Sequence, residues 1–236
     1  MYRSLDVNSI VKTVQTLEKR VAERFPDRGL THVCRELLEV AQQTQKRADW
    51  IARPNWWIRT AVFLLILLVI FITIAAPILL GVQLTEMSLA DFVQTVEASL
   101  NDIIIIGAVI FFLLSLERRR KRERTLDALH ELRSLAHVID MHQLTKDPER
   151  ILGLVNGPDT QSSPKEDMSA FELERYLDYC SEMLSLIGKV AAIYVQDLDE
   201  PSVVTAVNEI ENLTTSLSRK IWQKIMIIYS MEENLR

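Results

Sequence analysis

Two apolar stretches decide the fold of this chain: residues 61–80, AVFLLILLVIFITIAAPILL, and residues 103–116, IIIIGAVIFFLLSL. Only Thr73 and Pro77 interrupt the first stretch. As a helix it would be roughly 30 Å long, which is the thickness of the hydrocarbon core of a bilayer. The second stretch would cover about 21 Å, and snorkelling of the arginines that follow it would extend its reach. We therefore expect both stretches to cross a membrane.

The positive charges of the chain lie only outside this region. No lysine or arginine occurs between Arg59 and Arg118, and the loop between the two stretches carries only acidic charges. The positive-inside rule therefore predicts a protein integral to the cytoplasmic (inner) membrane, with both termini in the cytoplasm and a short loop outside. A buried hairpin in a soluble protein would explain the apolar stretches but not the charges. No cleavable signal peptide is visible, so the first span is expected to act as the insertion signal.

The remaining sequence has the pattern of helices, and the whole chain contains only 6 glycines and 7 prolines. The predicted fold is all-α: a two-span transmembrane helical hairpin with a cytoplasmic helical bundle built from the N- and C-terminal segments. The N-terminal segment is too short to bury a core alone, so it must pack on the C-terminal part or on another subunit. The predicted parts are an N-terminal helical pair (1–55), the transmembrane hairpin (56–117, with spans at about 58–80 and 100–117 and an outer loop at 81–99), a basic juxtamembrane helical rod (118–155), a linker (156–167) and a C-terminal helical hairpin (168–236).

The best-specified soluble element begins at residue 169. Ser169 and Glu172 form the capping-box pattern S-x-x-E, and apolar residues then follow in a coiled-coil-like 4-3 alternation. Further apolar residues widen this stripe, so the helix needs more than one partner helix. Asp6 and Asn8 are the two predicted starts of the first N-terminal helix, and Thr31 is the predicted cap of the second. The apolar stripe of the helix that begins after Ser169 comprises Leu173, Tyr176, Leu177, Cys180, Met183, Leu184, Ile187, Val190, Ala191 and Tyr194.

Three of the four histidines lie in residues 129–144, LHELRSLAHVIDMHQL. His130 and His137 are roughly 10 Å apart along a helix, too far to share one ion, whereas His137 and Asp140 are close enough to supply two ligands. One interpretation is therefore a metal- or proton-sensing cluster, because histidine titrates near neutral pH. The other, which the pattern favours, is a structural His137–Asp140 hydrogen bond with an Arg133–Asp140 contact. The candidate sensing residues are His130, His137, Asp140 and His142.

A basic run follows the second apolar stretch directly. A basic run beside a span usually indicates the cytoplasmic side of the membrane. The same charges attract anionic lipid head groups, with about 1 kcal/mol of binding free energy per residue. Trp56 and Trp57 stand at the start of the first span, where interfacial aromatic anchors are expected. The predicted lipid-contacting residues are Arg118, Arg119, Arg120, Lys121, Arg122 and Arg124.

The sequence argues against several functional classes. The spans contain no ionisable residue, which is untypical of coupled transporters and pumps. No nucleotide, metalloprotease or hydrolase motif is present, so no enzyme and no cofactor are expected. The net charge of −5 argues against nucleic acid as a partner.

We therefore expect a non-enzymatic membrane protein whose cytoplasmic helices mediate homo-oligomerisation or dock a soluble cytoplasmic partner. The wide apolar stripe of the helix after residue 169 is the feature that motivates this expectation. The alternative is a homo-oligomeric ion channel with an apolar pore that is gated from the cytoplasmic domain.

Overall fold

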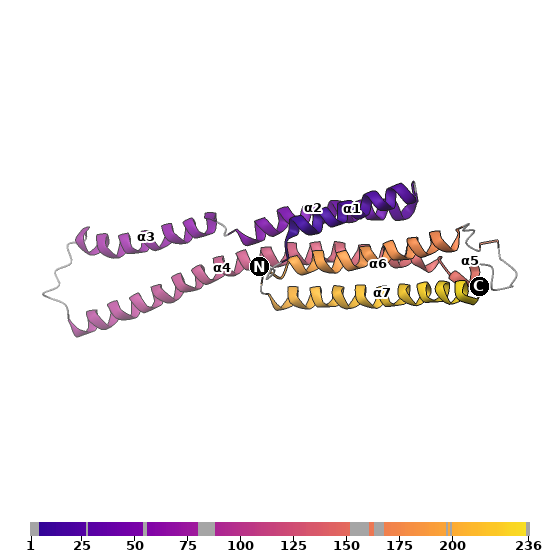
Figure 1. The fold of residues 1–236 in the computed structure, drawn as a ribbon. Coiled ribbons are helices and arrows are strands. Elements are labelled where there is room, and N and C mark those ends of the chain that lie inside the picture. The colour runs from indigo at the N-terminus through magenta and orange to yellow at the C-terminus, as the bar shows by residue number, and fades with distance from the viewer. Residues whose placement is uncertain are drawn as a thin grey trace. The chain divides into compact units, whose positions relative to one another are not determined.

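The computed structural model describes residues 5–26, 28–53, 56–79, 88–151, 161–162, 168–196, 198 and 200–234. Within these ranges every regular element is a helix, so the all-helical prediction is confirmed for them (Figure 1). The predicted linker, 156–167, lies outside the described residues except for a turn at 161–162. The helices are α1 (Val7–Arg24), α2 (Gly29–Ala52), α3 (Trp56–Leu79), α4 (Leu89–Leu144), α5 (Pro148–Ile151), α6 (Ala170–Ile193) and α7 (Pro201–Asn234).

The chain divides into two compact units. Arg53–Glu123 forms the first, which we call the apolar unit, and Met1–Ala52 with Arg124–Arg236 forms the second, which we call the core unit. Helix α4 is one continuous helix, of which the part up to Glu123 belongs to the apolar unit.

The apolar unit contains α3 and the first part of α4. Both helices are long and apolar enough to cross a membrane, and their most apolar windows bury nothing within the chain. Their hydroxyl groups are satisfied inside the same helix: Thr73 Oγ1 donates to the carbonyl oxygen of Val69 at 2.8 Å, and Ser99 Oγ donates to that of Thr95 at 2.8 Å. Polar groups satisfied in this way are compatible with a lipid environment.

The core unit is built around α6, which contacts α1, α2 and α7. Side chains from α1, α2, α4, α6 and α7 share one hydrophobic core. All ten residues of the predicted α6 stripe are buried, which confirms the stripe and its need for several partner helices. Because α1, α2 and α7 of the same chain supply those partners, the width of this stripe does not call for a second subunit.

Two of the three predicted helix caps are present in the structure. Asp6 caps α1, accepting hydrogen bonds from the backbone N–H groups of Asn8 at 3.1 Å and Ser9 at 3.2 Å. The capping box of Ser169 and Glu172 is present in full at the start of α6. The prediction for Thr31 is wrong, because α2 begins at Gly29 and the Thr31 hydroxyl instead donates to the carbonyl oxygen of Phe25 at 2.6 Å.

Polar groups buried in the core unit connect helices that are distant in sequence. Tyr194 Oη donates to Thr44 Oγ1 at 3.1 Å, which links the end of α6 to α2. Lys224 Nζ donates to the carbonyl oxygens of Gln143, in the last turn of α4, at 2.6 Å and of Lys146, just beyond that helix, at 3.0 Å. Burial lowers the pKa of Lys224. Burial also raises the pKa of the thiols of Cys34 and Cys180 to about 12, so both behave as small apolar core residues.

Candidate functional site: a groove on α6

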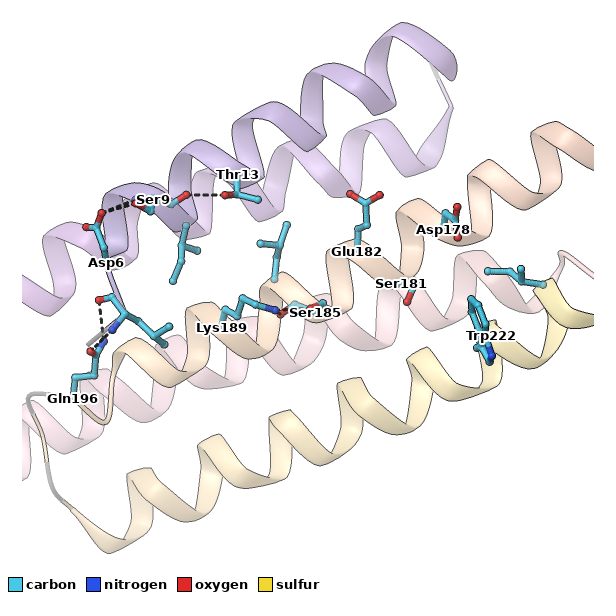
Figure 2. A pocket seen from close by; sticks show the side chains of 14 residues that line it. Asp6, Ser9, Thr13, Asp178, Ser181, Glu182, Ser185, Lys189, Gln196 and Trp222 are labelled. Atoms are coloured by element: carbon cyan, nitrogen blue, oxygen red, sulfur yellow. Dashed lines mark hydrogen bonds between the residues drawn. The ribbon is translucent and has the colours of Figure 1, made fainter. Parts of the chain in front are cut away.

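An open groove of about 1070 Å³ runs along α6 between α1 and α7 (Figure 2). It lies entirely within the core unit. Its lining comes from the start of α1 (Leu5, Asp6, Ser9, Ile10, Thr13), from α6 and the turn after it (Asp178, Ser181, Glu182, Ser185, Leu186, Lys189, Gln196) and from α7 (Trp222, Ile225).

The exposed face of α6 forms the floor of this groove. Ser181, Ser185 and Lys189 follow one another at four-residue spacing, so they share one side of the helix. Short hydroxyl side chains at two of these positions leave room between the flanking helices. Much of the remaining α6 surface is buried in the hydrophobic core, although Phe171 and Glu172 at its start are exposed outside the groove. The groove therefore lies along a part of α6 that its neighbouring helices leave uncovered.

Most charged groups of the groove are already engaged within the chain. Glu182 accepts hydrogen bonds from Arg20 Nη1 at 2.9 Å and from Nη2 at 3.2 Å, and this contact raises the pKa of Arg20. Asp178 pairs with Arg175, but burial is the larger influence and raises the pKa of the Asp178 carboxyl group. Lys189 Nζ donates to Ser185 Oγ at 2.6 Å. Arg20 and Arg175 thus neutralise Glu182 and Asp178, and Asp6 and Lys189 leave one charge of each sign in the groove.

Trp222 is the large aromatic side chain of this groove. It projects from α7 with 56 % of its surface exposed, and Met226 and Tyr229 continue an exposed stripe along the same helix with 48 % and 42 %. This stripe is not among the features predicted from the sequence. The available signal was three large side chains at spacings of four and three residues, outside the buried stripe of α7.

The structure does not gather the predicted sensing residues into one site. Among the residues it describes, no group of three or more histidine, cysteine, aspartate or glutamate side chains is arranged to hold a metal ion. His130 and His137 are exposed on α4. Asp140 Oδ1 accepts a hydrogen bond from Gln143 Nε2 at 2.6 Å, and Arg133 pairs with Glu209 of α7 at 3.2 Å. The contacts expected between His137, Arg133 and Asp140 are therefore replaced by these two.

His142 has a structural role instead. Its ring lies so close to Gly29, the first residue of α2, that a β-carbon at Gly29 would collide with it. His142 Nδ1 is also 3.5 Å from Tyr176 Oη of α6. The half-buried ring thus fills the space where the end of α4 meets α2 and α6.

The predicted lipid-contacting residues differ in their partners. Within the apolar unit, Arg119 pairs with Glu123 at 3.0 Å and Lys121 with Glu117 at 3.2 Å. Arg118 and Arg120 are exposed and Arg122 is half-buried, whereas the Arg124 guanidinium lies over the Trp50 ring of α2, 4.4 Å from its centroid. The predicted anchors Trp56 and Trp57 begin α3 with 74 % and 86 % of their surface exposed.

We compared the chain with protein-family models, with curated proteins and with solved structures, and no match was found in any of the three.

Proposed function

We propose that this protein is a non-enzymatic, membrane-anchored docking protein whose groove on α6 receives an amphipathic helix of a soluble cytoplasmic protein. In this proposal α3 and the first part of α4 anchor the chain in the cytoplasmic membrane, with both termini inside. The observation that carries the proposal is the groove itself, which has one helix as its floor, a helix on either side and an exposed tryptophan on one wall.

The dimensions of the groove suit a helical ligand. Its lining on α6 extends from Asp178 to Lys189, which is about 17 Å of helix or three turns. Recognition of a helix in a groove usually relies on a few apolar anchors placed one turn apart. Trp222 and Leu5, with 56 % and 41 % of their surfaces exposed, are the anchors that this groove offers.

The charges of the groove are balanced. Arg20 and Arg175 neutralise Glu182 and Asp178, so Asp6 and Lys189 leave one negative and one positive group along the lining. A helix with charges of both signs on its polar face would complement them, and such complementarity sets orientation and speeds association more than it raises affinity.

Site-specific photo-crosslinking in native membranes tests the proposal. A photoreactive phenylalanine in place of Ser185 would sit on the groove floor, and the same residue in place of Ser216, which is exposed on α7 outside the groove, serves as the control. We expect a discrete adduct with another protein from position 185 and none from position 216. Adding Trp222→Ala should reduce that adduct roughly tenfold or more, since buried tryptophans dominate interface energetics, while Gln223→Ala should leave it unchanged.

Two results would contradict the proposal. Equal adducts from positions 185 and 216 would mean that the groove has no special affinity. An adduct with twice the mass of the chain would show that the groove joins two copies, and the partner would then not be a soluble protein. The ion-channel alternative stays a prediction from the sequence, which recording from the purified protein in planar bilayers would test.

A further inference from the structure

A second, smaller pocket lies between α2 and the part of α4 that belongs to the core unit. Its volume is about 420 Å³. The buried side chains of Ile51 and Ala128 form an apolar floor, with 4 % and 1 % of their surfaces exposed. Charged side chains and one indole form the rim: Lys46, Arg47, Trp50, Arg124, Asp127 and Glu131.

The rim keeps a surplus of positive charge. Arg47 is committed to Glu131, with Nη1 and Nη2 at 2.8 Å and 3.2 Å from its two oxygens, and that contact raises the pKa of Arg47. Within the described residues, Lys46 and Arg124 have no carboxylate partner. Asp127 is the one remaining acid of the rim, so Lys46 and Arg124 together leave one positive charge uncompensated.

Trp50 positions one of these cations. The Arg124 guanidinium lies over the indole ring at 4.4 Å from its centroid, a cation–π contact that fixes the direction of its N–H donors. Trp50 itself has 41 % of its surface exposed, and an indole with an apolar face and a polar N–H prefers the membrane–water interface.

We propose that this pocket binds the phosphate group of an anionic phospholipid. A phosphodiester carries one negative charge, which matches the surplus of the rim, and its oxygens accept hydrogen bonds from a guanidinium and an ammonium group. The apolar floor would contact the carbon atoms next to the phosphate. The inference goes beyond the docking groove, because it assigns a ligand to a different part of the core unit.

The source of the phosphate group is argued from the position of the pocket along the chain. Trp50 precedes Trp56, where α3 begins, by six residues, so the two are at most ~21 Å apart at ~3.5 Å per residue. Arg124 follows Leu116, the last residue of the second apolar stretch, by only eight residues. Both walls of the pocket therefore belong to segments that adjoin the candidate spans.

The test is a titration of the full-length protein in an uncharged detergent with short-chain phosphatidylglycerol, followed by native mass spectrometry. The pocket variant is Arg124→Gln. The matched control is Arg120→Gln, which removes the same charge from an exposed position in the basic run outside the pocket. We expect Arg124→Gln and Lys46→Gln each to weaken binding about fivefold, the ratio equivalent to ~1 kcal/mol, and Arg120→Gln to weaken it less than twofold.

Two outcomes would overturn the proposal. If Arg120→Gln weakens binding as much as Arg124→Gln does, the basic run attracts lipid by diffuse charge and the pocket has no role. If inorganic phosphate displaces phosphatidylglycerol at equal concentration, the pocket takes free phosphate and the assignment to lipid is wrong. Circular dichroism should be unchanged in all three variants, because each replaces an exposed side chain.

Discussion

The apolar unit and the core unit use the same aliphatic side chains in opposite ways. Leu68 in α3 has 54 % of its surface exposed, whereas Leu184 in α6 has none. In the core unit other helices of the chain cover the apolar side chains. In the apolar unit these side chains stay exposed, as is expected of surfaces that face lipid. Helix length does not distinguish the two, since α3 and α6 each have 24 residues. The difference lies in whether a neighbouring helix of the chain covers the apolar face.

Hydrogen bonding follows the same contrast. Thr73 of α3 and Thr44 of α2 each donate to the carbonyl oxygen four residues earlier, at 2.8 Å in both cases. Thr44 also accepts a hydrogen bond from Tyr194, 150 residues away, and so connects two helices. Thr73 therefore relies on a hydrogen bond within its own helix, whereas Thr44 also helps to specify which helices pack together.

The largest effect is expected in a test of membrane topology, because a reporter fusion gives either full signal or none. A reporter that is active only outside the cytoplasm should give signal when fused at Gln94, in the exposed first part of α4, and none at either terminus. Signal from a C-terminal fusion would mean that residues 103–116 do not span, and the contrast between the two units would then need another explanation.

Matched leucine truncations compare the two units directly. Leu184→Ala should lower the free energy of unfolding by about 2–5 kcal/mol, because it leaves a cavity in a closed core. Leu68→Ala should change it by less than about 0.5 kcal/mol, because 54 % of the Leu68 surface is exposed and the truncation would leave no closed cavity. Chemical denaturation in detergent, followed by circular dichroism, measures both, and similar losses would refute the distinction.

A smaller loss of stability is expected at the end of α4, where Lys224 binds two backbone carbonyl groups. Lys224→Ala should cost about 1–3 kcal/mol, since the carbonyl groups of Gln143 and Lys146 would lose a charged donor. Lys220→Ala, one turn earlier and exposed, is the control and should stay within about 0.5 kcal/mol. Thermal unfolding of the two variants side by side gives the comparison, and equal stabilities would rule out a capping role for Lys224.

The close approach of Gly29 and His142 predicts that Gly29→Ala lowers the free energy of unfolding by about 1 kcal/mol. Gly29→Ala places a methyl group against the His142 ring, which must then shift and so disturb its 3.5 Å contact with Tyr176. In a His142→Ala background the same substitution should be nearly neutral. A double-mutant cycle from thermal melts measures this coupling, and additive effects would show that the ring moves freely.

The smallest effect is expected at His137. Its side chain is exposed and Asp140 is engaged with Gln143, so His137→Gln should change stability by less than about 0.5 kcal/mol. Melting temperatures with and without zinc, at two pH values, should match those of the unmodified protein. A shift that depends on zinc or on pH and disappears in the variant would restore the sensing interpretation.

Local patterns in the sequence were sufficient to predict much of the core unit. The predicted α6 stripe has the 4-3 alternation of an amphipathic helix, and every member of it is buried. The capping box at Ser169 depends on four consecutive residues and is equally visible from sequence. Such features are predictable because the interacting groups are neighbours along the chain.

The candidate sites could not be predicted in this way, because they are formed by residues far apart in sequence. Trp222 and Leu5 line one groove, and Trp50 and Arg124 meet in one pocket, only because α1, α2, α4, α6 and α7 pack as they do. The same holds for His142, whose spacing suggests a ligand cluster although its ring is used to pack against Gly29. Residue type and spacing indicate what a side chain is able to do, and the neighbours that select one role come from tertiary packing.

The hydrogen bond between Thr44 and Tyr194 also has a consequence for biosynthesis. Its two ends are separated by 150 residues, and both apolar stretches lie between them. At about 5–20 residues per second, a ribosome needs roughly 8–30 seconds to make that interval. During this time α1 and α2 exist without α6, and the valines and leucines they later bury lack their final cover. Translation speed and the holding of nascent chains by chaperones should therefore influence the yield of this protein more strongly than that of a protein whose core comes from one uninterrupted segment.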